Sequence, residues 1–518
     1  MRPRTLLFSW LLASGSPFPA FHVPVVARAA RAICERAAPE DPLESLAADL
    51  HAPAPRTRRR AVRNAAAVAT PAAWDLVVEA LDDDASEVAD AAQTALGAVA
   101  DAEVLAALFG ARGLRSPSAA VRERVAEALG RVSLEIDVTA VSRRLSTRGP
   151  DVACTRMLLW TLQRQGLAGR LVGDFRRAAR TLRSIAGGRR DPRLRAEALL
   201  ALGVLDPPGS ADLRLESLSA PDAVLRCAAL EAERLAAGDR VLSWARRLAA
   251  DDAPGVRARA VITLETLASR EALVVLVGRL GLESELGLRW RILEALRRGS
   301  GMKYRFDPRP WREWLERLDD AWVPPAPADY DLPPLERTKA LAGLPVRSDR
   351  IAFLFDFSGS MWTPLADGRT PKDVVEVELR RALEHLGEQA RFNLIPFTYD
   401  PVPWKPRLVA ADRANVRRAL DFYGRCHARG QGNFFDAALL ALEDPDVDTL
   451  VVLTDGVPTG GTHSDMELLA PLLLREILLR PVAIDVVLVD APAGAEARWR
   501  RLARATGGTL TEARLAGS

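Results

Sequence analysis

An apolar residue followed by arginine recurs at a nearly constant interval in the middle of this 518-residue chain. The arginines Arg195, Arg226, Arg257 and Arg289 are separated by 31, 31 and 32 residues. A unit of about 30 residues has room for two short helices, and such a unit cannot cover its own apolar faces. Successive units must therefore stack on one another, which predicts an elongated helical array rather than a single compact core.

Weaker copies of this pattern lie upstream. They are Val62-Arg63, Val88-Ala89 and Val121-Arg122. After Val121 the apolar residues recur at the spacing of one face of a helix, so that face must be buried against a neighbour. We therefore predict an α-solenoid over residues 40–320. The units resemble HEAT repeats, particularly the short kind in phycobilisome lyase-type proteins, and this resemblance implies a scaffold or docking surface.

The repeat pattern ends in a cluster of tryptophans followed by prolines. Trp311, Trp314 and Trp322 lie close together in the sequence, and a terminal repeat needs its open core covered. We expect these side chains to cap the end of the array rather than to bind a ligand. Five prolines between residues 324 and 334 then predict a semi-rigid linker over residues 321–345.

A different pattern begins after residue 345. Apolar runs of strand length alternate with helical patterns, and each run is apolar throughout. Strands of this kind, separated by helices, are typical of a mostly parallel sheet with helices on both faces. We predict a doubly wound, Rossmann-like α/β domain over residues 346–518. The expected strands are 351–355, 392–397, 450–453 and 482–489, and the expected helices are 373–386, 413–422, 434–442, 466–479 and 496–505.

Polar side chains directly follow two of these strands. The first strand is followed by Asp356-Phe357-Ser358-Gly359-Ser360, and the third by Thr454-Asp455-Gly456. In a doubly wound sheet the ligand site lies beyond the carboxyl ends of the strands, so these side chains are expected to meet there. Asp-x-Ser-x-Ser with a later Thr-Asp-Gly is similar to the metal-ion-dependent adhesion site (MIDAS) of von Willebrand factor A (VWA) domains.

This resemblance implies a metal site formed by Asp356, Ser358, Ser360 and Asp455. The implied ion is Mg²⁺, or Mn²⁺ or Ca²⁺ in its place, and Mg²⁺ is a hard ion that takes oxygen ligands and keeps several waters. By resemblance, Ser358 and Ser360 bind the ion directly, while Asp356 and Asp455 hold its waters and orient the serines. In the family, an acidic residue of a partner protein completes the coordination. The implied function is non-enzymatic, adhesion-type protein binding.

One position departs from the family pattern. The loop before the third helix of the domain reads Gly430-Gln431-Gly432-Asn433, where the family places a threonine ligand. Gly432 falls at the threonine position, so a water is expected to replace the hydroxyl. With a shift of one residue, Gln431 or Asn433 would instead approach the ion.

Three other interpretations of these residues remain open. Asp356, Ser358 and Ser360 could form a strand-to-loop turn with local capping bonds. An aspartyl phosphatase-like hydrolase also places an aspartate after the first strand, but it calls for a second acid at position 358, where this chain has serine. A lyase role, suggested by the repeat type, calls for a reactive cysteine on the array, whereas Cys154 and Cys227 are expected to be buried.

Two further groups of polar residues are given no role. Thr459, Thr462 and His463 lie in the loop after the third strand and could shape the rim of the site, but we interpret them as ordinary loop residues. The pair Cys426-His427 has no third orienting group, which nucleophilic catalysis would require.

Charge and the amino-terminal segment bear on where the protein acts. The chain has 71 basic and 68 acidic residues, and a net charge of +3 gives no drive toward nucleic acid. Basic residues precede an apolar run from Leu6 to Ala13, and small residues and prolines follow it, as in a secretory signal over residues 1–30. The run is too short to span a membrane. We therefore expect an exported protein, periplasmic, secreted or at the cell surface, with no integral membrane span beyond this signal.

Overall fold

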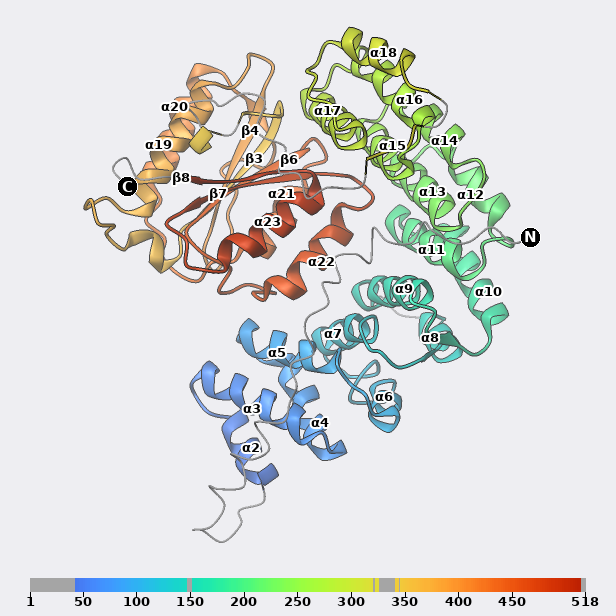
Figure 1. Ribbon diagram of the computed structural model, residues 1–518. Helices are drawn as coiled ribbons and strands as arrows, with labels where there is room; N and C mark the ends of the chain where they lie inside the picture. The colour runs from blue at the N-terminus through green and yellow to red at the C-terminus, as the bar shows by residue number, and fades with distance from the viewer. Residues whose placement is uncertain (1–41, 147–150, 320–321, 326–340, 344, 514–518) are drawn as a thin grey trace.

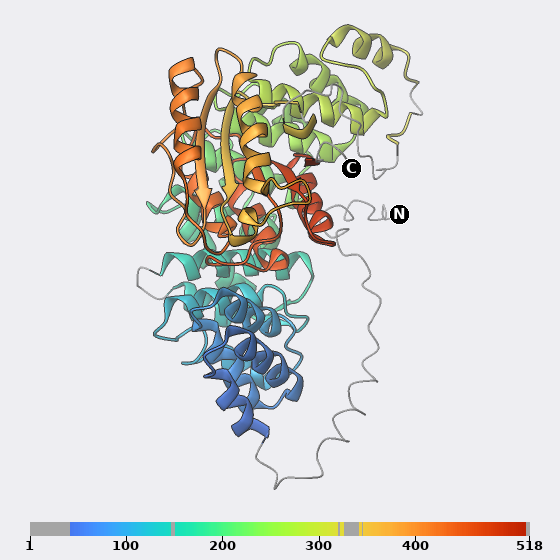
Figure 2. The same ribbon diagram turned by 90° about the vertical axis from the view of Figure 1, so that its left-hand side faces the viewer.

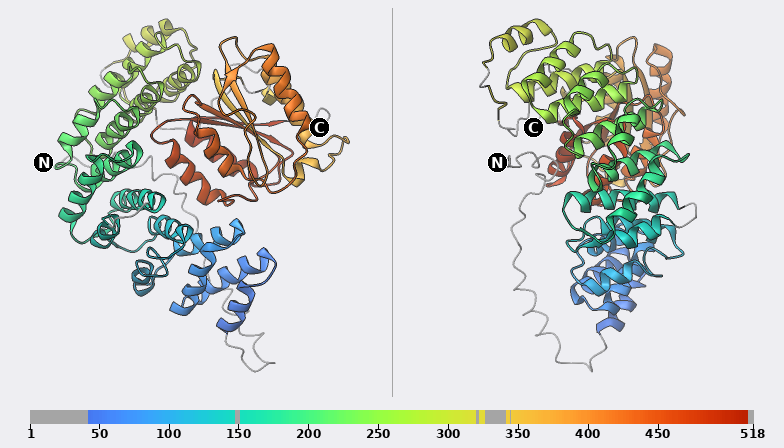
Figure 3. Two further views of the ribbon diagram at one scale, coloured as in Figure 1. Left: turned by 180° about the vertical axis from the view of Figure 1, so that it is seen from behind. Right: turned by 90° about the vertical axis from the view of Figure 1, so that its right-hand side faces the viewer.

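The computed structural model describes residues 42–146, 151–319, 322–325, 341–343 and 345–513. Figure 1 shows two regions: a curved array of helices, and an α/β domain on the inner side of the curve. Figures 2 and 3 show the same arrangement from other directions, with the domain against the array in each view. The predicted signal, residues 1–30, and most of the predicted linker, residues 321–345, lie outside the described residues.

The first region consists of helices with one pair of short parallel strands. Polar side chains cap many of the helix starts, as Asp222 does by accepting a hydrogen bond from Val224 N at 2.8 Å, which satisfies an amide that has no partner within the helix. Among the described residues, no helix has the length and apolar character needed to cross a membrane. The elements are α2 (Pro42–Leu50), α3 (Pro55–Val68), α4 (Pro71–Glu79), η1 (Ala80–Asp82), α5 (Ser86–Leu96), α6 (Ala102–Leu108), α7 (Ala119–Leu129), β1 (Ile136–Asp137), α8 (Val138–Leu145), α9 (Val152–Leu167), β2 (Leu171–Val172), α10 (Phe175–Ala186), α11 (Pro192–Leu205), α12 (Ala211–Ser217), α13 (Ala223–Leu235), α14 (Val241–Leu248), α15 (Pro254–Leu267), α16 (Arg270–Leu280), α17 (Leu286–Ser300) and α18 (Pro308–Glu316).

The helices of the array form two layers. From α3 to α17, each odd-numbered helix contacts the next odd-numbered helix, and together these helices make the inner layer. The even-numbered helices pack on the outside of this layer, for example α10 on α11, α14 on α15 and α16 on α17. Apolar side chains between the layers are buried, so the core runs along the array instead of lying at one centre. The prediction that this region is helical is confirmed.

The recurring arginines link consecutive units of the array. Arg226 Nη1 donates to the carbonyl oxygens of Ala220 and Pro221, both at 2.8 Å. Its Nε and Nη2 donate to the Asp251 carboxylate at 2.9 and 2.7 Å. The planar guanidinium thus ties the turn before its own helix to an acid in the next unit, with the geometric specificity of a bidentate pair. The same contacts recur at Arg58 with Asp83 and at Arg257 with Glu283, while Arg122 contacts two carbonyl oxygens and Asp151 through Nε alone.

Other arginines of the sequence pattern do not make this link. In the first unit the linking residue is Arg58, whereas Arg63, which the sequence pattern had singled out, is exposed. Arg195 donates to a backbone carbonyl at 3.0 Å instead of to an acid. The Arg289 guanidinium lies 5.1 Å from the centre of the Phe306 ring. An arginine therefore links two units only where the next unit places an acid within its reach.

Aromatic rings cover the carboxyl-terminal end of the array. Trp311 is fully buried on α18, which packs on α16. The ring centres of Trp311 and Trp314 are 6.4 Å apart, and those of Trp314 and Trp322 are 5.9 Å apart, both in edge-to-face geometry. Trp311 Nε1 donates to the Arg305 carbonyl oxygen at 2.8 Å, so the buried indole N–H has a partner. These tryptophans pack on the last helices of the array, as a terminal cap does.

The α/β domain is built on a six-stranded sheet with the strand order β5-β4-β3-β6-β7-β8. All neighbouring strands are parallel except β5, which is antiparallel to β4. The expected mostly parallel sheet is therefore confirmed, although the sequence pattern did not predict the short strands β5 and β8. The elements are η2 (Leu341–Gly343), β3 (Arg350–Asp356), η3 (Gly359–Trp362), α19 (Pro371–Glu384), β4 (Arg391–Phe397), β5 (Val409–Ala410), α20 (Arg413–Arg425), α21 (Phe434–Leu442), β6 (Thr449–Thr454), α22 (Met466–Ile477), β7 (Ala483–Val489), α23 (Ala495–Thr506) and β8 (Leu510–Ala513).

Helices cover both faces of this sheet. Along β3, Phe353 and Phe355 belong to the core beneath α19 and α20, while Ala352 and Leu354 belong to the core beneath α21, α22 and α23. Successive residues of a strand point to opposite faces, so a strand with a core on each side must be apolar throughout. This is the physical reason for the uninterrupted apolar runs in the sequence.

The α/β domain packs against the inner layer of the array through α22. Arg475 Nη2 on α22 donates to Glu197 on α11 at 2.9 Å. Arg156 Nη2 on α9 donates to Glu476 on α22 at 2.8 Å. The core beneath α22 is also continuous with the core of the array. The α/β domain of the same chain therefore covers part of the inner layer of the array. The sequence had predicted that the array provides a docking surface.

Candidate metal site

The predicted site residues come from two neighbouring strands. Asp356 is the last residue of β3, and Asp455 directly follows β6, which pairs with β3 in parallel. Ser358 and Ser360 lie in the loop after β3, at η3. Because β3 and β6 are parallel, their carboxyl ends meet at one edge of the sheet, and the order of connections reverses between them. The structure therefore brings all four residues together at the switch point of the sheet.

Hydrogen bonds connect the four side chains into one cluster. Asp356 Oδ1 accepts from Ser358 N at 2.7 Å, which folds the loop back over the end of β3. Ser358 Oγ and Ser360 Oγ lie 3.1 Å apart, and Ser360 Oγ donates to Asp455 Oδ1 at 2.9 Å. Asp356 Oδ2 accepts from Thr454 Oγ1 at 2.6 Å. Thr454 received no role from the sequence, although its place directly before Asp455 was the available signal.

The two carboxylates of this cluster are buried and form no ion pair with another described residue. Asp356 is 4% exposed and Asp455 is 9% exposed. Burial raises the pKa of Asp356, and burial together with the charge of Asp356 raises the pKa of Asp455 to about 6. Within the described part of the chain, no Lys, Arg or His nitrogen lies within 4.0 Å of either carboxylate. A divalent cation at this edge would offset both the burial and the repulsion, so the residues present fit such an ion.

The remaining oxygens of the cluster are hydroxyls. Over the described ranges there is no group of three or more His, Cys, Asp or Glu side chains placed to hold a metal ion. The serine hydroxyls of the cluster are oxygen donors, which suit Mg²⁺ better than a soft metal.

Gly432 lies beside the cluster, as the sequence alignment with the family predicted. A Cβ atom built on Gly432 would be 3.6 Å from each carboxylate oxygen of Asp356 and 3.7 Å from Ser358 Cβ. Gly432 N donates to Thr459 Oγ1 at 2.8 Å, and Thr459 N donates to Gly432 O at 3.1 Å. Gly432 thus contributes no side chain to the cluster, and Thr459 holds its backbone in place.

The two neighbours of Gly432 turn away from the carboxylates. The Gln431 side chain packs against Gly460, since a Cβ atom built on Gly460 would clash with Gln431 Oε1. Asn433 caps α21: its Oδ1 accepts from Asp436 N at 3.3 Å, and its Nδ2 donates to Tyr399 O at 2.7 Å. The structure therefore places glycine, rather than Gln431 or Asn433, next to Asp356.

Other residues considered from the sequence have structural surroundings. Cys154 and Cys227 are buried, as expected, and burial raises the pKa of each thiol to about 12. Cys426 is half-buried, and burial raises the pKa of its thiol. His463 was interpreted as an ordinary loop residue, and this was wrong: it is buried against the array, where its Nδ1 lies 2.8 Å from Asp90 Oδ1.

Sequence comparison connects the chain to a group of VWA-containing proteins. No family model matches the chain. It is 35% identical over 130 residues to inter-alpha-trypsin inhibitor heavy chain 4 of Mus musculus and 33% identical over 131 residues to heavy chain H4 of Homo sapiens. Each alignment covers 23% of this chain and 13% of the relative. The similarity thus concerns a small part of these relatives.

Structural comparison finds distant neighbours for both regions. A von Willebrand factor type A protein from Catenulispora acidiphila is 21% identical with a TM-score of 0.28, over 33% of this chain and 39% of that one. The complex of CpcE and CpcF of phycocyanin lyase from Nostoc is 19% identical with a TM-score of 0.23, over 55% of this chain and 96% of that one. These TM-scores are low, so we base no argument on the structural neighbours. The similarity to known proteins rests on the sequence comparison.

Proposed function

We propose that this chain, which the sequence similarity supports as a von Willebrand factor A-type domain protein, is a non-enzymatic module that binds a partner protein through a divalent cation. Asp356, Ser358, Ser360 and Asp455 hold the cation, which is Mg²⁺, or Mn²⁺ or Ca²⁺ in its place. A glutamate or aspartate of the partner takes the coordination position that faces solvent. The observation that carries this proposal is the pair of buried carboxylates, without a cationic neighbour among the described residues, beside two serine hydroxyls.

The spacing of the oxygens supports this assignment. Mg²⁺ takes six oxygens in an octahedron at roughly 2.0–2.1 Å, so two adjacent ligand oxygens lie about 2.9 Å apart. Ser358 Oγ and Ser360 Oγ are 3.1 Å apart, close to that separation. We assign these hydroxyls as direct ligands, and the carboxylates of Asp356 and Asp455 as acceptors for the waters of the ion and for the serine hydroxyls.

The rim of the site is open on one side. Ser360 and Thr459 are exposed, and Gly432 contributes no side chain there. When bound, the cation supplies positive charge and a free coordination position, which together attract a carboxylate. A partner that presents an acidic side chain on a protruding segment fits this arrangement.

We assign the array the part of a HEAT-like scaffold that carries the binding domain. Its inner layer contacts the domain, and its outer layer is formed by the even-numbered helices. A lyase role is disfavoured, since both cysteines in the described part of the array, Cys154 and Cys227, are buried. A phosphatase-like role lacks the second acid, since position 358 is serine. The signal-like segment at residues 1–30 favours action outside the cytoplasm.

Calorimetric titration of Mg²⁺ or Mn²⁺ into the full chain tests the metal site. We expect binding by the wild type and loss of binding in Asp356→Ala. Asp421→Ala is the matched control, because Asp421 is exposed on α20, away from β6. Equal heats for the wild type and Asp356→Ala would refute the metal site.

A pull-down with and without a chelator tests the partner side of the proposal. We expect a protein that the full chain retains in Mg²⁺ and releases in EDTA, and that Asp356→Ala does not retain. Retention that neither the chelator nor this substitution changes would argue against binding through the cation.

A further inference from the structure

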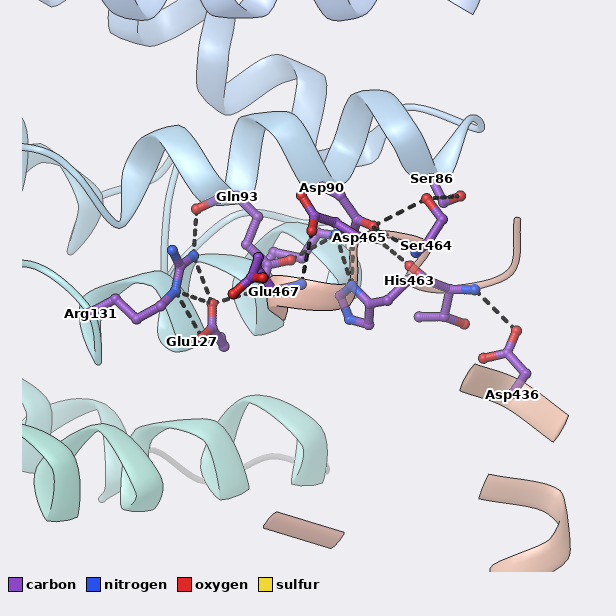
Figure 4. A network of polar contacts seen from close by, with 12 residues as sticks. Ser86, Asp90, Gln93, Glu127, Arg131, Asp436, His463, Ser464, Asp465 and Glu467 are labelled. Atoms are coloured by element: carbon purple, nitrogen blue, oxygen red, sulfur yellow. Dashed lines mark hydrogen bonds and ion pairs between the residues drawn. The ribbon is translucent and has the colours of Figure 1, made fainter. Parts of the chain in front are cut away.

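The loop between β6 and α22 joins the candidate metal site to the array. At its start, Thr459 holds the backbone of Gly432 beside Asp356. At its end, Asp465 caps α22. Figure 4 shows residues of this end, with His463 and Ser464 reaching Asp90 and Ser86 of the array.

Asp90 on α5 holds the end of this loop with both carboxylate oxygens. Its Oδ1 lies 2.8 Å from His463 Nδ1, and its Oδ2 accepts from Ser464 N at 2.7 Å and from Asp465 N at 2.9 Å. Asp90 is 2% exposed. Burial acts to raise the pKa of Asp90, but the hydrogen bond and charge of His463 and the charge of Arg124 lower it to about 2. Asp90 is thus a buried anion at the amino end of α22, where free amides favour negative charge.

Arg124 on α7 holds the same loop by a carbonyl. Its Nη2 donates to Thr462 O at 2.7 Å, and its Nη1 donates to Asp90 Oδ1 at 2.9 Å and to Gln93 Oε1 at 2.7 Å. Gln93 Nε2 in turn donates to Glu127 Oε2 at 2.7 Å. These side chains all belong to the array, which thus provides both an acceptor, Asp90, and a donor, Arg124, to the loop.

A second set of hydrogen bonds connects this loop to the segment beside the candidate site. Thr462 N donates to Asp436 Oδ2 at 3.0 Å, and Asn433 Nδ2 donates to the same oxygen at 2.8 Å. Asn433 directly follows Gly432, whose N–H and carbonyl both bond Thr459. The loop is therefore tied at two points to residues 432–436, the segment that lies beside the Asp356 carboxylate.

We propose that Asp90 is a positioning residue for the candidate metal site: by holding residues 462–465, it keeps the Gly432 and Thr459 backbones in register beside Asp356. The array then helps to build the site, in addition to carrying the domain. Loss of this contact loosens the Gly432–Thr459 pair but leaves the sheet intact, because the strands hold one another. The consequence for cation affinity rests on the proposed function, whereas the consequence for the loop does not.

Hydrogen exchange of backbone amides, measured on the full chain without added metal, tests this role. In Asp90→Asn we expect the amides of Gly432 and Thr459 to exchange about tenfold faster than in the wild type, although neither bonds Asp90. Amides within β6 should keep their protection. Asp83→Asn is the matched control, because Asp83 pairs with Arg58 inside the array, and it should leave Gly432 and Thr459 unchanged.

Two results of the exchange experiment would overturn the inference. One is unchanged exchange at Gly432 and Thr459 in Asp90→Asn. The other is equal acceleration in Asp83→Asn, since the effect would then come from a general loss of stability in the array. If Asp90→Asn does not fold, His463→Ala removes part of the same contact from the domain side and should give the same pattern.

Titration with Mg²⁺ separates this inference from the proposed function. In Asp90→Asn we expect the Kd for Mg²⁺ to rise between about twofold and thirtyfold, the range that coupling through packed networks reaches, and in Asp83→Asn we expect no change. An unchanged Kd in Asp90→Asn would show that Asp90 does not act on the site. If the wild type binds no Mg²⁺, the proposed function fails, and the exchange result still decides the role of Asp90.

Discussion

Replacing Gly432 by threonine tests where the cation binds. A Cβ atom at this position would lie 3.6 Å from each Asp356 carboxylate oxygen and 3.7 Å from Ser358 Cβ, which are ordinary van der Waals distances. The φ angle of Gly432 is not positive, so a residue with a side chain fits this backbone without strain. Gly432→Thr therefore adds a hydroxyl beside the cluster, where we expect a water to complete the coordination of the ion.

The size of the effect follows from the water that the hydroxyl displaces. Ordering a bridging water costs between about 0 and 2 kcal/mol of binding free energy. Replacing that water with a hydroxyl fixed to the chain can therefore improve the binding free energy of the ion by no more than this amount. We expect Gly432→Thr to bind Mg²⁺ between about threefold and tenfold more tightly than the wild type. Gly432→Ala is the matched control, because it adds the Cβ atom without the hydroxyl. Replacing glycine with alanine here should also raise the free energy of unfolding by about 0.4–1 kcal/mol through the unfolded chain.

Calorimetric titration of the three proteins at one pH and salt concentration provides the measurement. The order of Mg²⁺ affinity should be Gly432→Thr, then the wild type and Gly432→Ala together. If Gly432→Thr binds Mg²⁺ no more tightly than Gly432→Ala, the hydroxyl does not reach the ion. The placement of the cation next to Asp356 would then be wrong, even if the chain binds a metal.

Three further predictions concern stability, measured by urea denaturation of the full chain. Burial raises the pKa of Asp448 to about 6, so the stability that its protonated form contributes is lost as pH rises: the share of Asp448 in the fall of the free energy of unfolding should be at most about 3 kcal/mol between about pH 4 and pH 6. Asp448→Asn should reduce this slope by that share without abolishing it, because burial and the charge of Asp356 also raise the pKa of Asp455 to about 6; an unchanged slope would contradict the role of Asp448. Arg226→Gln leaves the largely buried Asp251 carboxylate without its arginine partner and should lower the free energy of unfolding by about 2–4 kcal/mol. Arg63→Gln, at an exposed arginine, should change it by less than about 0.5 kcal/mol. Equal losses in the two variants would contradict the linking role of Arg226. Trp311→Ala removes a fully buried ring from the end of the array and should lower the free energy of unfolding by about 3–5 kcal/mol, and a loss below 1 kcal/mol would show that the tryptophans do not cap a core.

Much of the fold could be predicted from the sequence because it depends on local patterns. The regular apolar-arginine interval and helical periodicity indicated the array, and apolar runs between helices indicated a sheet buried on both faces. The candidate site could be predicted for a related reason. Parallel strands end at one edge of a sheet, so polar residues directly after two neighbouring strands, Asp356 and Asp455, had to lie close together.

The tertiary structure decided which side chains work together across long separations in sequence. It selected Arg58 rather than Arg63 as a linking residue, because only Arg58 lies within reach of Asp83. It placed His463 against Asp90, 373 residues earlier in the chain. Periodicity shows which face of an element is apolar, but not which other element covers that face. The packing of the α/β domain on the inner layer of the array, and with it the surroundings of the candidate site, therefore became visible only in three dimensions.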